Sequence, residues 1–174
     1  MRPRRLHRMV RRSAATLPMA RFYGIIQPPL DRLVYRLSHG RASATSWLAG
    51  LPIIMLTTTG ARTGLPRTTP LLGLPDGQEF ILIASNYGRP GHPAWYFNLR
   101  ADQHATIVVD GQSREVVAYE LQGAERERDY RRGEAVFAGF TRYRGWAANR
   151  TIPVLRLRPD VRTPRGGGTA GRPS

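Results

Sequence analysis

Cysteine and lysine are both absent from this chain of 174 residues. Without cysteine the protein has no disulfide, no thiol nucleophile and no thiolate ligand for zinc or an iron–sulfur cluster. Histidine is scarce, and none of the four histidines stands at a metal-ligand spacing such as HExxH. Composition therefore excludes thiol chemistry and gives no support for a metal site.

Long hydrophobic runs are absent as well. No apolar stretch reaches the roughly 18–20 residues that a transmembrane helix needs. Arg11 and Arg12 resemble part of a twin-arginine signal, but Pro18 and Arg21 interrupt the apolar residues that follow. We therefore expect no secretion signal and a cytoplasmic location.

Acidic residues are few. The 27 basic residues, all of them arginine, stand against 12 acidic ones, which gives a formal net charge of +15. Because guanidinium groups bind phosphate and carboxylate through a bidentate fork, this balance indicates an anionic partner: a small polyanion, an acidic membrane surface or nucleic acid. The arginines are partly concentrated in two tails and no nucleic-acid-binding motif is present, so we expect no nucleic acid partner.

The middle of the chain has the pattern of one folded domain. We expect this domain to span residues 22–159, between a basic, mobile arm at 1–21 and a disordered tail at 160–174. Within residues 26–40 apolar side chains recur at helical spacing. Two interpretations of this helix stay open: it packs on the domain, or it docks with the basic arm on an anionic membrane.

Strand patterns dominate from residue 51 onward. Helices are expected at 94–100 and 123–137, the second with a solvated face of Glu and Arg pairs. The fold class is mainly β (α+β), a small barrel of about six strands with flanking helices. A dinucleotide-binding domain is excluded, because strands and helices do not alternate and GxGxxG is missing. The runs that predict strands are 51–58, 68–74, 79–84, 106–109, 114–119 and 153–158, with hairpin turns at Asp76-Gly77 and Asp110-Gly111.

A loop rich in glycine and arginine, at 60–70, is the first candidate site. Gly60 and Gly64 allow a sharp turn that aims backbone N–H groups at an anion. Arg62 and Arg67 can bind phosphate or carboxylate oxygens. An ordinary hairpin with solvated arginines explains the same residues equally well. Hydroxyl donors are available at Thr63, Thr68 and Thr69.

The second candidate site covers residues 83–99, where a strand opens into a loop and then a helix whose N-terminus attracts negative charge. Trp95 and Tyr96 can pack against a flat ring system. For Trp95 we favour core packing, because Trp95 and Leu99 stand at i and i+4. His92 is interpreted as structural.

Aromatic residues then recur every three positions or so, at Phe137, Phe140, Tyr143 and Trp146. This spacing fits either packing in a core or an aromatic wall over a planar cofactor or acceptor. The pattern leaves both interpretations open.

Taken together, these segments resemble the deazaflavin-dependent nitroreductase family, in order and spacing, from about residue 35 to 159. The resemblance implies a split β-barrel related to flavin-binding barrels. It also implies reduced coenzyme F420, an 8-hydroxy-5-deazaflavin, as the hydride donor. The segments that carry it are LTTTG at 56–60, the loop at 62–70, ASN at 84–86, HPAWYFNLR at 92–100 and RTIPV at 150–154.

By position, the resemblance places the coenzyme's phosphate or oligoglutamate tail at Ala61, Arg62 and Thr63. Ser85 and Tyr143 become the candidates for donating a proton or orienting the acceptor. The acceptor pocket is expected at Leu72, Phe137, Phe140 and Tyr143. The full set assigned to the coenzyme is Ala61, Arg62, Thr63, Arg67, Thr68, Thr69, Pro70, Leu71, Leu72, Ile83, Ala84, Ser85, Asn86, Ala94, Trp95, Tyr96, Phe97, Asn98 and Phe140.

Three positions depart from the family's pattern. Leu72, Phe137 and Phe140 stand where nitroimidazole-reducing relatives carry tyrosines. A site without those hydroxyls should orient a polar nitro group poorly while still accepting an apolar quinone. The expected activity is hydride transfer to a quinone-like or other electrophilic acceptor, with weak or no nitroimidazole reduction. The main alternative is a split-barrel protein that binds FAD, fatty acid or another lipid without catalysis.

Overall fold

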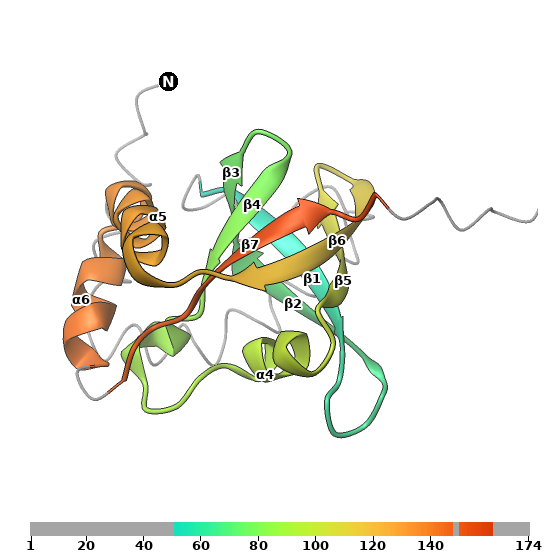
Figure 1. Cartoon of the computed structure of the whole chain (residues 1–174), viewed down its shortest axis with the longest axis horizontal. Coiled ribbons are helices and arrows are strands. Elements are labelled where there is room, and N and C mark those ends of the chain that lie inside the picture. Colours follow the sequence, from blue (N-terminus) through green and yellow to red (C-terminus); the bar gives the residue numbers. More distant parts are fainter. Residues whose placement is uncertain (1–50, 148–149, 162–174) are drawn as a thin grey trace, which may run out of the picture.

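The structure, a computed structural model, describes residues 51–147 and 150–161 of the chain. The expected arm at 1–21, the helix at 26–40 and all but the first two residues of the expected tail lie outside the described residues. The described residues form seven strands, three helices and one short 3-10 turn, η1 (Figure 1). In chain order these are β1 (Ile53–Thr59), β2 (Pro66–Leu72), β3 (Leu74–Asp76), β4 (Glu79–Ile83), η1 (Asn86–Gly88), α4 (Ala94–Ala101), β5 (His104–Val109), β6 (Gln112–Glu120), α5 (Gly123–Val136), α6 (Gly139–Trp146) and β7 (Val154–Pro159).

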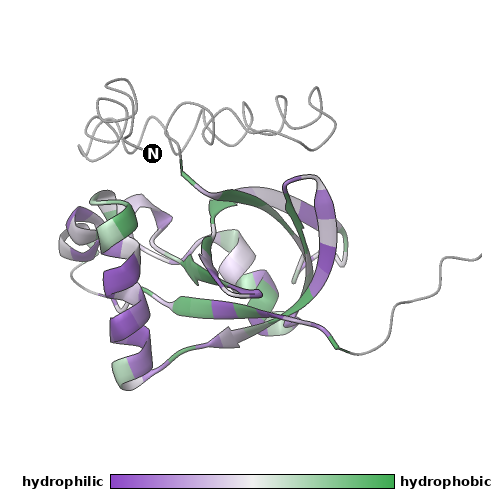
Figure 2. Cartoon of the chain, turned by 90° about the horizontal axis from the view of Figure 1, so that it is seen from above, coloured by the Kyte–Doolittle hydropathy of each residue, from purple (hydrophilic) through white to green (hydrophobic). Residues whose placement is uncertain are grey.

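All seven strands belong to one antiparallel sheet, in the order β2-β1-β5-β6-β7-β4-β3. The sheet curls strongly around an interior, with α4 near one end and α5 and α6 on one side (Figure 2). The predicted class, a small barrel with flanking helices, is confirmed. The number of strands exceeds the expected six by one, because the run at 68–74 is two strands.

Gly73 separates these two strands. β2 ends at Leu72 on one edge of the sheet, and β3 begins at Leu74 on the other edge. The N–H of Gly73 donates to the carbonyl oxygen of Pro52 (3.0 Å), and a Cβ at Gly73 would lie 2.8 Å from Cγ2 of Ile54. Glycine is therefore required where the chain passes from one edge to the other and brings the two edges of the curled sheet together.

The turns follow the local sequence. Asp110 and Gly111 have φ values of 49° and 79°, so both central residues of the β5–β6 turn are left-handed, as a primed hairpin turn requires. In the β3–β4 turn Gly77 has a φ of 63°. Both predicted hairpin turns are confirmed, and both fix the register of the strands that they join.

Two apolar cores lie on opposite faces of the sheet. Along β4, Phe80 and Leu82 pack inside the barrel, whereas Ile81 and Ile83 pack toward α5 and α6. This division follows from the two-residue period of a strand. The barrel interior also receives Trp95, Tyr96 and Leu99 from α4, so this helix covers one end of the barrel. This burial agrees with the core packing that the sequence predicted for Trp95.

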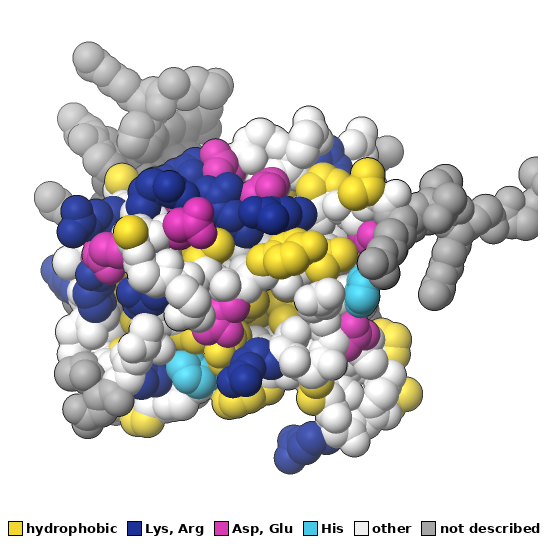
Figure 3. Space-filling model, viewed as in Figure 1, with side chains coloured by type: hydrophobic (Ala, Val, Ile, Leu, Met, Phe, Trp, Pro, Cys, Tyr) yellow, Lys and Arg dark blue, Asp and Glu magenta, His cyan; other side chains and the backbone are white. Residues whose placement is uncertain are grey.

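A buried carboxylate anchors α5 to the sheet. Asp129 is 0% exposed, and its Oδ2 accepts hydrogen bonds from Nε and Nη2 of Arg156 on β7, both at 2.8 Å. Arg156 Nη1 also reaches carboxylate oxygens of Asp76 and Glu79, each at 2.9 Å. Over this side of the molecule basic and acidic side chains are interspersed (Figure 3). The charged pattern of α5 is thus only partly a solvated face, which corrects the sequence interpretation.

Candidate functional site

The β1–β2 loop, residues 60–65, carries the first set of predicted binding residues. Gly64 N–H donates to the carbonyl oxygen of Gly60 (2.7 Å), and Gly60 N–H donates to that of Leu65 (2.9 Å). These bonds and the positive φ of Gly64 (66°) make a tight turn. The side chains of Ala61, Arg62 and Thr63 are exposed on it, and Arg67 is exposed at the start of β2.

The side-chain amide of Asn98 ties this loop to α4. Its Oδ1 accepts a hydrogen bond from Ala61 N–H (3.0 Å), and its Nδ2 donates to the hydroxyl of Thr58 on β1 (3.0 Å). Thr58 and Asn98 are both buried. Asn98 therefore positions the β1–β2 loop, in addition to any contact with a ligand.

The assigned residues on β2 lie directly opposite β1. Thr68, Thr69, Pro70 and Leu71 pair with Thr57, Leu56, Met55 and Ile54, and all four are half-buried. The hydroxyls of Thr57 and Thr68 are 2.9 Å apart and share a hydrogen bond. This strand leads from the exposed arginines of the loop to Leu72, at the edge of the apolar core beside α5 and α6.

The β4–α4 loop, residues 84–93, has an unusual backbone. Asn86 and Tyr87 have positive φ values of 49° and 56°, followed by Gly88 at 72°. Asparagine is among the residues that tolerate this conformation, whereas a bulky side chain such as tyrosine rarely adopts it. A Cβ at Gly88 would lie 2.9 Å from Cβ of Trp146, so the loop lies directly against α6. Strain of this kind is concentrated at functional sites in proteins.

Ser85 begins this loop and is only 8% exposed. It follows Ile83 and Ala84 at the end of β4, both buried, and Ala84 N–H donates to the carbonyl oxygen of Pro153 (2.9 Å). The side chain of Asn86 donates to the carbonyl oxygen of Gly91 (3.3 Å), which closes the loop on itself. The predicted sequence ASN thus lies at the turn between the sheet and α4.

Helix α4 turns its assigned residues in two directions. Trp95 and Tyr96 are buried in the barrel interior, and the hydroxyl of Tyr96 donates to Glu120 on β6 (3.0 and 3.2 Å). Ala94 and Phe97 are exposed. The helix begins at Ala94, directly after the β4–α4 loop.

The aromatic residues of the last helix form one cluster. Ring centroids lie 5.5 Å apart for Phe137 and Phe140, 6.1 Å for Phe140 and Tyr143, and 5.6 Å for Tyr143 and Trp146. Tyr143 is 3% exposed, and burial raises its pKa. Phe137, Phe140 and Tyr143 belong to the core beside α5, with Leu72, Tyr87 and Trp146 at its partly buried margin.

The predicted acceptor residues Leu72, Phe137, Phe140 and Tyr143 are therefore brought together, mostly buried. The ring of Tyr87, in the β4–α4 loop, contacts that of Tyr143 edge-on at 6.0 Å. One end of the molecule thus holds, side by side, α6, the β4–α4 loop, α4 and the tip of the β1–β2 loop, along the lower edge of Figure 1.

Arg150 is a residue of this region that the sequence did not single out as a site residue. It donates to the carbonyl oxygens of Ser85 (2.7 Å) and Arg89 (3.2 Å) and to Nδ1 of His92 (3.2 Å). Burial, together with the charge of Arg150, lowers the pKa of His92. The structural interpretation of His92 agrees with these contacts. The only signal for Arg150 was its place in the segment RTIPV.

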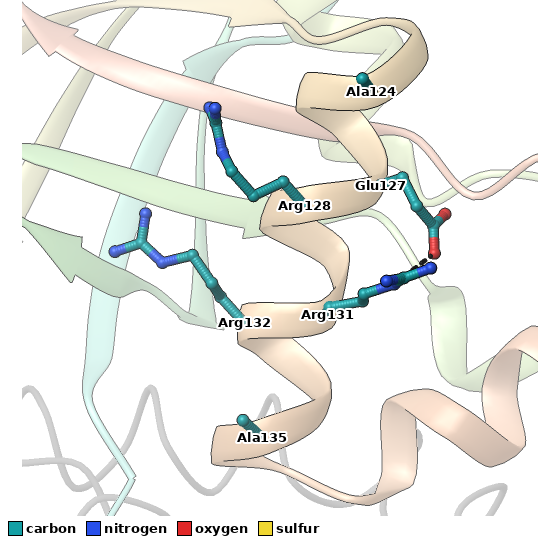
Figure 4. A pocket seen from close by; sticks show the side chains of 6 residues that line it. All are labelled: Ala124, Glu127, Arg128, Arg131, Arg132 and Ala135. Carbon is teal, nitrogen blue, oxygen red and sulfur yellow. Dashed lines mark hydrogen bonds and ion pairs between the residues drawn. The ribbon is translucent and has the colours of Figure 1, made fainter.

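A hollow lies apart from these residues, on the outer face of α5 (Figure 4). Its arginines are paired: Arg131 with Glu127 (3.2 Å), Arg132 with Asp76 (2.8 Å) and Arg128 with Asp129 (3.3 Å). None of the predicted site residues lines it. The lining residues are Ala124, Glu127, Arg128, Arg131, Arg132 and Ala135.

The described part of the chain contains no group of three or more His, Asp or Glu side chains that could hold a metal ion. Among the described helices none is long and apolar enough to cross a membrane.

Comparisons with known proteins point to one family. The family model described as F420H2-dependent quinone reductase matches residues 31–159. The F420H2-dependent quinone reductase Rv1261c of Mycobacterium tuberculosis (strain ATCC 25618 / H37Rv) is 33% identical over 145 residues, which cover 80% of this chain and 94% of that protein.

Solved structures agree. An F420-H2 dependent reductase (FDR-A) has a TM-score of 0.57 and 31% identity, covering 62% of this chain and 94% of its own. HutZ, a heme storage protein from Vibrio cholerae, has a TM-score of 0.50 at 13% identity, covering 75% of this chain and 90% of its own, and shares the fold alone. The expected split β-barrel is confirmed.

Proposed function

This chain belongs to the F420H2-dependent quinone reductase family, and on that premise we propose that coenzyme F420 binds where the β1–β2 loop, the β4–α4 loop and α4 meet. The protein is an oxidoreductase that depends on reduced F420 and passes a hydride to a quinone-like acceptor. When bound, the reduced deazaflavin supplies the hydride. The chain binds and orients the coenzyme and the acceptor and excludes water from them.

The chemistry of the residues present fits this coenzyme. An anionic phosphate and oligoglutamate tail needs exposed cations and N–H donors, and the β1–β2 loop offers Arg62, Thr63 and, nearby, Arg67. A flat ring needs an apolar wall, and Leu72, Tyr87 and Trp146 form the partly buried margin of the aromatic core. The observation that carries the proposal is that the Asn98 amide joins α4 to the loop that bears Arg62.

Ser85 and Tyr143 are the residues that we assign to the acceptor. Because burial raises the pKa of Tyr143, its hydroxyl keeps its proton at neutral pH and donates a hydrogen bond without titrating. Ser85 lies two residues before Tyr87, whose ring contacts that of Tyr143. Both hydroxyls are thus candidates for orienting a carbonyl oxygen of the acceptor through a hydrogen bond.

The acceptor that we propose is a quinone in preference to a nitroimidazole. Leu72, Phe137 and Phe140 give an apolar lining that suits a hydrophobic ring, and these three positions offer a nitro group no hydroxyl donor. With F420H2 and protein fixed, menadione should be reduced much faster than a nitroimidazole at equal concentration. Faster reduction of the nitroimidazole would contradict this preference.

The first experiment is a fluorescence titration of the purified full chain with F420, with FMN and FAD in parallel. Arg62→Ala should weaken F420 binding about tenfold, because one charge-assisted contact to the tail is lost. The matched control is Arg114→Ala. Arg114 is an exposed arginine on the β5–β6 hairpin. The tip of this hairpin lies beside the start of β1, whereas the β1–β2 loop follows the end of β1.

The outcomes separate the alternatives. A wild-type chain that prefers FAD or a fatty acid to F420 would favour the non-catalytic binding protein. Equal effects of Arg62→Ala and Arg114→Ala would place the anionic tail away from the β1–β2 loop.

Contact with an anionic membrane is a further part of the proposal, since a quinone acceptor is hydrophobic. Its support is the sequence: nearly all acidic residues lie in the described part of the chain, whereas about half of the arginines lie outside it. Co-sedimentation of the full chain with vesicles rich in anionic lipid, at low salt, is the test. Failure to co-sediment would remove the membrane contact and leave the enzyme assignment intact.

A further inference from the structure

Arg150 binds the β4–α4 loop at three points. Its Nη2 donates to the carbonyl oxygen of Ser85, its Nε to that of Arg89, and its Nη1 to Nδ1 of His92, at 2.7, 3.2 and 3.2 Å. Since arginine only donates, Nδ1 of His92 accepts, and the imidazole is neutral with its proton on Nε2. One side chain, 58 to 65 positions away in sequence, therefore contacts the loop near its beginning, in its middle and near its end.

The loop needs such contacts to keep its shape. Asn86 and Tyr87 both have left-handed backbone conformations, which are strained for a bulky residue such as tyrosine. Within the loop, Gly88 N–H donates to the carbonyl oxygen of Ser85 (2.9 Å) and Arg89 N–H to that of Asn86 (3.0 Å). The same Ser85 oxygen accepts the shortest of the three bonds from Arg150. Strained backbone persists only where its surroundings over-determine it.

Arg150 is itself held firmly. Its own N–H donates to the carbonyl oxygen of Ala147 (2.9 Å). Downstream, the carbonyl oxygen of Ile152 accepts from Nε of Arg126 (3.0 Å), and that of Pro153 accepts from Ala84 N–H (2.9 Å). The segment before β7 is thus fixed to α5 and to the end of β4.

The partners of Arg150 distinguish it from the structural arginines of this fold. Arg156, Arg132 and Arg144 bind carboxylates. Among the described residues, the hydrogen-bond acceptors of Arg150 are two carbonyl oxygens and one imidazole, and burial lowers its pKa. Arg150 is therefore a half-buried arginine that has no carboxylate partner among the described residues. Its five N–H donors suit three neutral acceptors that lie at separate points of the loop.

We propose that Arg150 is a positioning residue for the coenzyme, which holds the β4–α4 loop in its binding conformation before the coenzyme arrives. The inference rests on the proposed function, because it takes this loop to be the one that contacts the deazaflavin ring. A loop that is already ordered loses less entropy on binding, so pre-organisation appears as affinity. Loss of Arg150 should therefore weaken coenzyme binding.

The test uses the full chain with three variants: Arg150→Gln, Arg150→Lys and, as a control, Arg114→Gln. Arg114 is an exposed arginine that donates to Gln112 on the same strand and contacts neither the β4–α4 loop nor the segment before β7. Hydrogen exchange of the peptide spanning residues 85–93 is measured without coenzyme, and F420 affinity by fluorescence titration. Both Arg150 variants should expose the Gly88 and Arg89 amides to exchange and weaken F420 binding about tenfold or more. Arg114→Gln should change neither.

Lysine should fail to rescue, because one ammonium cannot span three separated acceptors. Full recovery by Arg150→Lys would overturn the positioning role in favour of a simple charge effect. Unchanged exchange of the 85–93 peptide in Arg150→Gln would overturn the inference by itself. Raised exchange with unchanged F420 affinity would instead overturn the proposed placement of the ring on this loop, so the two failures are distinguishable.

Discussion

At the scale of single residues, the Asn98 amide is the link between two binding segments. Its two ends satisfy Ala61 N–H and the buried hydroxyl of Thr58, so α4 and the β1–β2 loop keep a fixed spacing. An amide is suited to this task, because it donates and accepts at adjacent atoms. Without it, the loop would be held only by its own turn.

Asn98→Ala should therefore have two effects. It leaves the Ala61 N–H and the buried hydroxyl of Thr58 without their hydrogen-bond partner, which should lower the free energy of unfolding by about 1–3 kcal/mol. It also releases the loop that bears Arg62, which should weaken F420 binding several-fold. Urea unfolding and fluorescence titration measure the two effects. Thr106→Val, which removes an exposed hydroxyl bonded to Glu115, is the control and should leave F420 affinity intact. If Asn98→Ala lowers the free energy of unfolding but leaves the affinity for F420 unchanged, the role of Asn98 is structural only.

The sequence pointed to Asn98 but not to its partners. Its contact with Ala61 crosses 37 positions, and the bond of Arg150 to Ser85 crosses 65, so neither has a local pattern. The aromatic spacing at 137–146 was likewise compatible with a core or a binding wall, because the sequence does not show which distant residues pack against these rings. Burial of Phe140 beside Tyr130, whose hydroxyl donates to the Phe140 carbonyl oxygen (2.8 Å), depends on the packing of two helices.

At the scale of elements, glycine sets how closely α5 approaches the sheet. A Cβ at Gly133 would overlap Cδ1 of Ile83 on β4 and lie 3.3 Å from Cδ2 of Phe140 on α6. Gly145 in α6 is different, because nothing lies within 4 Å of its Cβ position. The two glycines therefore form a matched pair in which helix propensity is similar and packing is not.

Gly133→Ala should destabilise the protein, because overpacking costs about 1–3 kcal/mol and exceeds the gain of at most about 1 kcal/mol from helix propensity. Gly145→Ala should be neutral or stabilise the fold by up to about 1 kcal/mol. Thermal or urea unfolding of both variants measures the difference. Equal stabilisation of the two would mean that Ile83 moves aside freely, contrary to the tight packing of this core.

Most strands and two of the three described helices were predicted, whereas α6 and the break between β2 and β3 were not. Hairpin turns such as Asp110-Gly111 and apolar alternation have local signals, and those elements were found. The run at 68–74 has no local sign of a break apart from Gly73, and only the closure of the sheet puts β2 and β3 on opposite edges. In the same way, Asp129 has no sequence pattern that sets it apart from the solvated charges of α5, because its burial depends on Arg156.

At the scale of the whole molecule, the candidate site and an ionic network share no residue. The network joins α5, the β3–β4 hairpin and β7 through Asp76, Glu79 and Asp129 with Arg132 and Arg156. Stability and binding should therefore separate in variants: changes in the network should alter unfolding with little effect on coenzyme affinity.

Asp76 gives this separation a pH dependence. Its hydrogen bonds with Arg132 (2.8 and 2.9 Å), more than the charge of Arg156, lower its pKa from 3.8 to about 2. A lowered carboxyl pKa stabilises the folded state above pH 3.8, and this stabilisation is lost as the pH falls through about 2. At neutral pH, Asp76→Asn should lower the free energy of unfolding by on the order of 1 kcal/mol, since the pair is partly exposed to solvent.

Urea unfolding at pH 7, 4.5 and 2.5 measures this dependence. The difference between wild type and Asp76→Asn should be largest at pH 7, nearly the same at pH 4.5 and clearly smaller at pH 2.5, because only the wild type loses an ion pair on protonation. Asp110→Asn, at the exposed β5–β6 turn, is the control. A difference that stays constant down to pH 2.5 would mean that Asp76 acts through its shape and not through its charge, and the network would then not govern acid unfolding.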